Sequence, residues 1–172
     1  MNRIRAYIVT AMSLFALAVA PPVGGAMAQQ QSIKEQLAGA WSLVSLVVVQ
    51  DEKKTDVFGE NPRGKMILTP DGHFSTLTTR AMLPKFASNN RLKGTPDEYR
   101  AIMEGVNAHF GTYVVDEANK TITFQVEVST FPNWDGQQHK RIFKLDGDVL
   151  SYVNPNTTIG APTAHVTWKR LK

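Results

Sequence analysis

Apolar and polar residues alternate along most of the chain beyond position 39, and this period of two predicts β-strands. The segment 39–49 is rich in Val and Leu, and every second residue in the segment 121–128 is apolar. Turns at 70–72, 117–120 and 146–147 separate such segments by short connections. Successive strands are therefore expected to pair with their chain neighbours as antiparallel hairpins.

A helical period occurs between residues 95 and 110. Thr95 and Glu98 have the spacing of a capping box, and Pro96 between them suits the first position of a helix. We therefore expect one substantial helix, inserted between hairpins, with a shorter helical stretch in the polar lead-in 29–36. Apolar residues recur at the spacing of one helix face, at Tyr99, Ile102, Met103, Val106 and Phe110.

The order of these elements predicts an all-β fold. The strands do not alternate regularly with helices, as they do in chains that build a parallel sheet. A long antiparallel meander without covering helices must close on itself to remove its edge strands. The expected architecture is an antiparallel up-and-down β-barrel of about eight to ten strands with one inserted helix. A β-sandwich is the alternative.

The segment 1–28 is expected to be a secretory signal peptide. A short basic start precedes an uncharged apolar run at 6–20, and Ala26-Met27-Ala28 provides the small residues that signal peptidase requires. A membrane anchor is disfavoured because the run is shorter than the ~20 residues of a transmembrane helix. Residues 29–172 then form one barrel domain, periplasmic or secreted, with no stable membrane anchor after cleavage.

Composition excludes several classes of function. The sequence has 19 Lys and Arg against 15 Asp and Glu, and without Arg3 and Arg5 of the expected leader the net charge is 17 − 15 = +2. No basic block occurs, so nucleic acid is not an expected partner. The chain has no cysteine, and its four histidines lack the spacing of metal ligands, so we expect no disulfide, metal or other cofactor.

The stretch Gly39-Ala40-Trp41 opens the first expected strand and resembles the Gly-x-Trp signature of the lipocalins. The resemblance implies that Trp41 packs across a closed barrel end, with a basic residue of the last strand against its face. Arg170 fits that role because it shares strand parity with the apolar Val166 and Trp168. Trp41 and Arg170 are therefore the expected barrel-closing pair, and such a stack contributes about 1–2 kcal/mol when desolvated.

Longer stretches resemble the bacterial lipocalin-like domain family of small barrels. The matching pieces, which cover nearly all of the expected mature chain, are "LAGAWSLVS", "DGHFS", "HFGTYVVD", "VEVSTFPNWDGQQHKRIFKLDGDVL" and "TWKRL". The resemblance implies a barrel with a cavity and implies little about activity. This chain has Phe124 and Phe110 where related sequences often have His and Tyr, so activity that needs that His is not expected.

Glu127 and Arg141 are the first candidates for a binding site. They flank the connection 129–138, and Arg141 shares with His139 and Phe143 a strand face that apolar parity places inward. A buried arginine needs a partner, which Glu127 is expected to supply if the lumen is polar there or a bulge shifts its register. The pair then anchors a ligand or performs acid–base chemistry; the alternatives are a structural ion pair and two solvated residues.

The leading functional hypothesis is a protein that binds a small, mostly apolar molecule in the barrel cavity. The inserted segment 80–106 is expected to lie over a barrel end or along the outside, as a lid or as a plug. The alternatives are a small barrel enzyme (isomerase, cyclase or hydrolase) using Glu127, Arg141 and His139, and a structural role without a ligand; oligomeric state stays open. The expected ligand-binding residues are Tyr113, Glu127, Arg141, His139, Phe124, Phe143, Phe74 and Met103.

Overall fold

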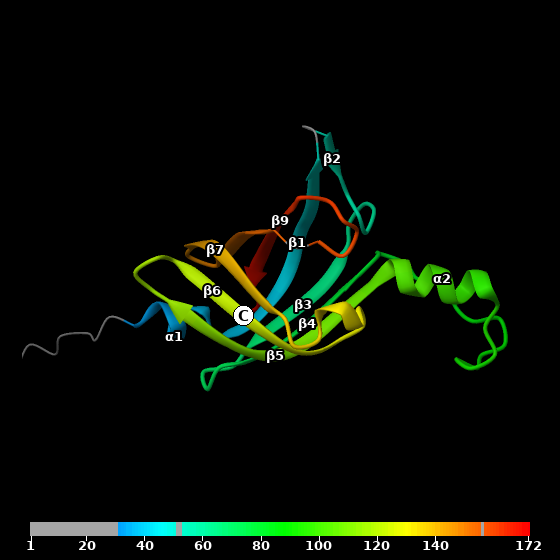
Figure 1. The fold of residues 1–172 in the computed structure, drawn as a ribbon, viewed down its shortest axis with the longest axis horizontal. Helices are drawn as coiled ribbons and strands as arrows, with labels where there is room; N and C mark the ends of the chain where they lie inside the picture. The colour runs from blue at the N-terminus through cyan, green and yellow to red at the C-terminus, as the bar shows by residue number, and fades with distance from the viewer. Residues whose placement is uncertain (1–30, 51–52, 156) are drawn as a thin grey trace, which may run out of the picture. The chain divides into compact units, whose positions relative to one another are not determined.

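The computed structural model describes residues 31–50, 53–155 and 157–172, so the expected signal peptide lies outside the described residues. Within that part, no helix is long and apolar enough to cross a membrane. The elements are α1 (Ile33–Leu37), β1 (Gly39–Gln50), β2 (Lys53–Thr55), β3 (Arg63–Leu68), β4 (His73–Thr79), α2 (Pro96–Gly105), β5 (Val106–Asp116), β6 (Thr121–Ser129), the 3-10 turn η1 (Pro132–Trp134), β7 (Gln138–Asp146), β8 (Val149–Asn154) and β9 (Thr163–Arg170) (Figure 1).

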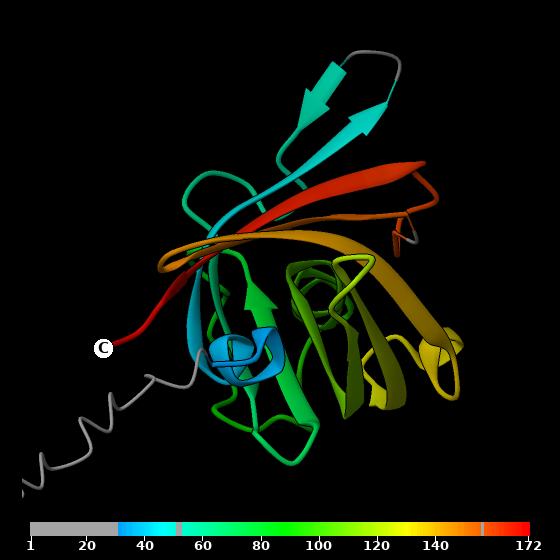
Figure 2. The same ribbon diagram turned by 90° about the vertical axis from the view of Figure 1, so that its left-hand side faces the viewer.

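The strands form a closed antiparallel barrel. Each strand from β3 to β9 pairs with its neighbours in chain order, and β1 pairs with both β3 and β9. The β1–β9 pairing closes the cylinder, because it joins the first strand to the last (Figure 2). In the described part of the chain β2 pairs with the end of β1 alone and extends beyond the barrel as an arm. The expected all-β up-and-down barrel with one inserted helix is confirmed, and the sandwich alternative is wrong.

The two ends of the barrel differ. α1 precedes β1 at one end, and α2 precedes β5 at the opposite end, where it stands to the side of the strands (Figure 1). Around the α1 end the lumen is filled with buried apolar side chains. These include Leu37, Trp41, Met66, Leu68, Phe74, Tyr113 and Phe124.

Trp41 and Arg170 close the α1 end together. The Trp41 side chain is fully buried and its Nε1–H donates to the Leu37 carbonyl at 2.9 Å. The Arg170 guanidinium carbon lies 4.2 Å from the centroid of the Trp41 ring, and its nitrogens donate to the carbonyls of Ala38 and Gln36. The guanidinium also connects the chain before β1 to the last strand through these two hydrogen bonds.

The glycine before Trp41 is required by this closure. Gly39 has a φ of +132°, which favours glycine, and a Cβ there would lie 2.9 Å from Nη1 of Arg170. The chain can therefore pass beneath the stacked Arg170 and Trp41 only without a side chain at position 39. This explains in physical terms why a glycine precedes the largest side chain at the mouth of β1.

Two details of β5 and β6 differ from the sequence-based expectation. α2 ends at Gly105, so Val106 and Phe110 belong to β5 and not to a helix face. The β5–β6 register shifts from Gly111–Val126 to Phe110–Val128, which leaves Glu127 as the extra residue of a bulge and exposes Val128. Strict alternation along β6 therefore fails in its last residues.

The expected capping box of α2 is present, with the Thr95 hydroxyl accepting from the Glu98 amide and the Glu98 carboxylate accepting from the Thr95 amide. We expect Thr95→Ala to cost the helix about 1 kcal/mol because one amide loses its acceptor. Faster amide hydrogen exchange confined to α2 would show this. Thr95→Ser retains the hydroxyl and is the control; equal exchange in all three proteins would contradict the prediction.

Candidate ligand-binding pocket

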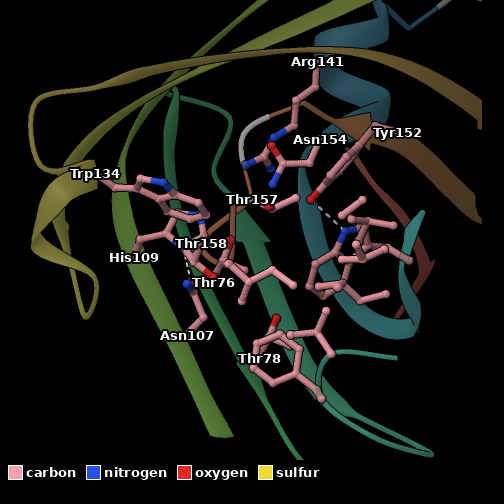
Figure 3. A pocket seen from close by; sticks show the side chains of 18 residues that line it. Thr76, Thr78, Asn107, His109, Trp134, Arg141, Tyr152, Asn154, Thr157 and Thr158 are labelled. Atoms are coloured by element: carbon pink, nitrogen blue, oxygen red, sulfur yellow. Dashed lines mark hydrogen bonds between the residues drawn. The ribbon is translucent and has the colours of Figure 1, made fainter. Parts of the chain in front are cut away.

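A pocket occupies the lumen at the end opposite Trp41 (Figure 3). Its cavity volume is about 60 Å³, and about 570 Å³ of empty space is present when the open mouth is included. The closed half of the barrel is thus a packed core, and the opposite half contains a small pocket that opens at its mouth. The lining residues are Leu46, Val48, Val57, Phe58, Thr76, Thr78, Asn107, His109, Trp134, Arg141, Tyr152, Asn154, Thr157, Thr158, Ile159, Ala164, Val166 and Trp168.

The walls of the pocket come from inward positions of the strands. β1 and β9 contribute aliphatic side chains such as Val48 and Val166, while β4 contributes the buried hydroxyl side chains of Thr76 and Thr78. The β4 residues alternate strictly, so these threonines share a face with Phe74 below them. The pocket is therefore mainly apolar, with polar groups at a few fixed places.

Connections between strands form the rim. Val57 and Phe58 come from the segment between β2 and β3, and Thr157, Thr158 and Ile159 from the segment between β8 and β9. The Thr157 hydroxyl donates to the Ala161 carbonyl at 2.6 Å, which fixes the second connection locally. No residue of 80–105 lines the pocket, so this segment is neither its lid nor its plug.

Arg141 carries the charge of the pocket. Its side chain comes from β7, is only 5% exposed, and reaches toward Asn154 and the pocket interior (Figure 3). The guanidinium carbon lies 4.8 Å from the Phe124 ring centroid and 4.9 Å from the Tyr152 ring centroid. Its Nε–H has no hydrogen-bond partner, and among the described residues it forms no ion pair. The buried guanidinium thus contacts two aromatic rings, and no acidic side chain of the described residues pairs with it.

Two histidines lie near this cation. His109 is 8% exposed and His139 is 2% exposed, and one ring nitrogen of each, Nε2 and Nδ1 respectively, lacks a hydrogen-bond partner. Burial first, and then the charge of Arg141, lowers the pKa of His109 to about 3 and that of His139 to about 4. Both rings are therefore neutral at neutral pH.

The aromatic ring of Trp134 holds these histidines in place. Trp134 is the last residue of η1. Its ring centroid lies 5.3 Å from the ring centroid of His109 and 4.6 Å from that of His139, and both contacts are edge-to-face. Asn107 Oδ1 lies 3.1 Å from His109 Nδ1. With that oxygen as acceptor, Nδ1 carries the proton and the unpartnered Nε2 of His109 is an acceptor.

Comparison with known proteins identifies the fold family. Residues 38–171 match the lipocalin-like domain family. The chain belongs to this family. The match covers β1 to β9, so it includes every strand of the lipocalin-like barrel and both the closed end and the pocket.

A characterised relative is a carrier. The 4'-hydroxy-3'-methoxypropiophenone carrier protein of Aspergillus oryzae is 27% identical to this chain over 106 residues, which make up 56% of this chain and 96% of that protein. The lipocalin-like barrel and the similarity to a carrier protein support ligand binding in general.

The expected pair of Glu127 with Arg141 is wrong. Glu127 is exposed on the outside of the barrel, whereas Arg141 is buried inside and pairs across the strands with Ile122. The bulge at Glu127 does occur, but it does not turn this side chain inward. Glu127 therefore cannot neutralise Arg141, and as a base for chemistry in the lumen it is on the wrong face.

The other expected ligand-binding residues do not line the pocket. Phe74, Phe124, Phe143 and Tyr113 face inward as expected but belong to the packed core. His139 is buried beside Trp134 and is not among the pocket's lining residues. The Tyr113 hydroxyl donates to the Thr69 carbonyl at 2.8 Å, and this hydrogen bond holds it at the closed end of the barrel. The expectation that Met103 lines the ligand pocket is wrong, because this residue is exposed on α2 and borders a separate surface hollow.

Several lining residues were not expected from the sequence. Parity along β4 and β5 would have indicated Thr76, Thr78 and His109, because each shares a face with apolar core residues. The rim residues and Trp134 give no such signal, since they lie in connections whose path depends on the closed barrel. In the described part of the chain no group of three His, Asp or Glu is placed to hold a metal ion.

Proposed function

We propose that this chain is a carrier that binds a small, mostly apolar molecule in the pocket above the packed half of the barrel. The observation that carries the proposal is this pocket in the lumen, whose mainly apolar walls include two buried nitrogens without hydrogen-bond partners, Nε of Arg141 and Nε2 of His109. Buried polar groups are normally hydrogen-bonded, and an exception calls for a specific reason. A ligand with an apolar body and one polar end would supply the missing partner.

The named ligand of the relative has this chemistry. A 4'-hydroxy-3'-methoxypropiophenone carrier handles a small aromatic ketone with a phenolic hydroxyl. In the present pocket, Trp134, Phe58 and Tyr152 offer apolar surfaces to such a ring, while Arg141 and His109 offer a donor and an acceptor. This combination supports a small aromatic ligand over a long aliphatic one.

We also propose that the protein acts in the periplasm or outside the cell. The support is the sequence of residues 1–28, with its basic start, apolar run and small-residue cleavage site. Fractionation of the host followed by N-terminal sequencing tests this. A mature chain that begins at Gln29 is expected, and an uncleaved chain in the cytosol would contradict it.

Probe binding tests the proposed pocket. We expect the neutral fluorescent probe N-phenyl-1-naphthylamine to bind the wild-type protein, and Ala164→Phe to weaken this binding at least about tenfold because the ring fills the mouth. His165→Phe adds the same ring on the exposed face of the same strand and is the matched control. Thr78→Phe, on the opposite wall, repeats the test from β4.

The outcomes separate a pocket ligand from a surface ligand. The proposal is supported if Ala164→Phe and Thr78→Phe both lose probe binding while His165→Phe keeps it. The far-UV circular dichroism of the variants should be unchanged. Equal binding by all four proteins would place the probe elsewhere and overturn it. Native mass spectrometry of protein purified from its host gives an independent check, since a carrier is expected to retain a small molecule.

A further inference from the structure

We propose that the polar end of the ligand is a carboxylate, which Arg141 binds inside the lumen, so that the cargo is a small aromatic acid in its anionic form. This inference rests on the proposed function, because it assigns the charge of a ligand that must first occupy the pocket. It goes beyond the neutral ketone that the relative's name indicates.

The positive charge of Arg141 has no acidic partner among the lining residues of the pocket. Arg141 is 5% exposed, and none of the residues that line the pocket is Asp or Glu. Glu127, the nearest candidate by sequence, lies on the outer surface. A buried cation without a counter-charge is costly. A ligand that brings one negative charge removes this cost on binding, whereas a neutral ligand does not.

The surroundings of the guanidinium leave one of its donors free. The guanidinium carbon of Arg141 lies 4.8 and 4.9 Å from the ring centroids of Phe124 and Tyr152, so it makes a cation–π contact with each ring. Its hydrogen-bonding edge remains, and Nε–H has no partner. Arginine N–H groups match the two oxygens of a carboxylate, which they bind in the guanidinium plane.

The single positive charge of the pocket suits a ligand with one negative charge. His109 and His139 lie near Arg141 but are held neutral by burial, so they add no positive charge at neutral pH. A phosphate monoester, with nearly two charges, would leave one of them uncompensated in an apolar pocket. In the tautomer whose Nδ1–H donates to Asn107, Nε2 of His109 is an acceptor and suits a hydroxyl elsewhere on the ligand, not the carboxylate itself.

Matched pairs of ligands test this assignment. Benzoate, cinnamate and 2-naphthoate are compared by calorimetry with the methyl ketones of the same three ring systems and with phenyl phosphate. We expect at least one acid to bind the wild-type protein about 10- to 100-fold more tightly than its ketone, the range of a hydrogen bond to a charged group.

Variants of β7 then test whether Arg141 causes the preference for the acid over the ketone. Arg141→Met is expected to abolish the preference for the acid while ketone binding stays measurable, and Arg141→Lys is expected to retain part of it because the charge remains. Lys140→Met removes the same charge from the exposed face of the same strand and is expected to change nothing. Thermal unfolding of each variant verifies that it is folded.

The results distinguish this inference from the proposed function. Equal affinity for acids and ketones, or a preference for the acid that survives Arg141→Met, overturns the carboxylate assignment and leaves the carrier proposal standing. Tighter binding of phenyl phosphate than of benzoate overturns it as well. Binding of no compound by the wild-type protein overturns the carrier proposal and this inference with it.

Discussion

Replacing Trp41 by alanine is expected to lower the free energy of unfolding by about 3–5 kcal/mol, the cost of removing a large buried aromatic side chain. The indole is fully buried, donates to Leu37 and carries the Arg170 guanidinium on its face, so the substitution removes packing, a hydrogen bond and a cation–π contact together. A domain of this size is typically stable by about 5–15 kcal/mol, so a substantial share is lost. Urea unfolding at neutral pH measures the effect.

Two variants separate closure of the barrel from general aromatic packing. Trp41→Phe keeps a ring beneath Arg170 but loses the indole donor to Leu37, and it is expected to lose less stability than the alanine variant. Trp134→Ala removes an indole from the pocket wall, where space already exists, and is expected to cost less than Trp41→Ala. A Trp41→Ala protein within about 1.5 kcal/mol of the wild type would contradict the role of Trp41 as the floor.

The ligand-free protein is expected to lose up to about 5 kcal/mol of stability between pH 6.5 and about pH 4.5, through His109 and His139. Their pKa values fall from 6.5 to about 3 and about 4 on folding. Below pH 6.5 the unfolded chain therefore binds protons that the folded protein does not, and stability falls as pH falls. Each histidine contributes at most about 1.4 kcal/mol per pH unit to this loss of stability.

The pH window assigns the loss to these histidines. Carboxylates with lowered pKa, such as Glu98 and Asp148, titrate in the unfolded chain near 4.5 and 3.8, so their share of stability is lost only at lower pH. His109→Gln combined with His139→Gln is expected to flatten the profile above about pH 4.5. His165→Gln, at an exposed position, is the control. A wild-type protein equally stable across this range would contradict the buried neutral state.

Strand parity indicated the inward positions of Arg170 and Arg141, whereas the place of Trp41 came from the resemblance to the lipocalins. Arg170 shares parity with Trp168, and Arg141 shares parity with His139 and Phe143. Sequential hairpins favoured closure into a barrel, because closure pairs both edge strands. These features depend on local spacing, which the sequence displays directly.

The errors arise where local spacing is interrupted. The bulge at Glu127 and the change from helix to strand at Gly105 occur without a proline or a turn motif, so the periodic patterns run across them unbroken. The rim residues, such as Phe58 and Ile159, are brought together by connections distant in sequence, and no periodicity encodes their meeting. A lid or a plug was expected from 80–106, because this long insertion between hairpins contains several large apolar residues. In the structure the β2–β3 and β8–β9 connections form the mouth instead.

The measurement that tests the central claim most directly is the NMR signal of the Arg141 side-chain Nε–H during titration with an aromatic carboxylate. If this group binds the ligand, its resonance moves downfield and its exchange with water slows, because the unpartnered donor gains an acceptor. The Nε–H of Arg170, 3.6 Å from Asp148 at the closed end, is expected to stay unchanged and serves as the internal reference. An Arg141 signal that remains unaffected while the carboxylate binds would contradict the account.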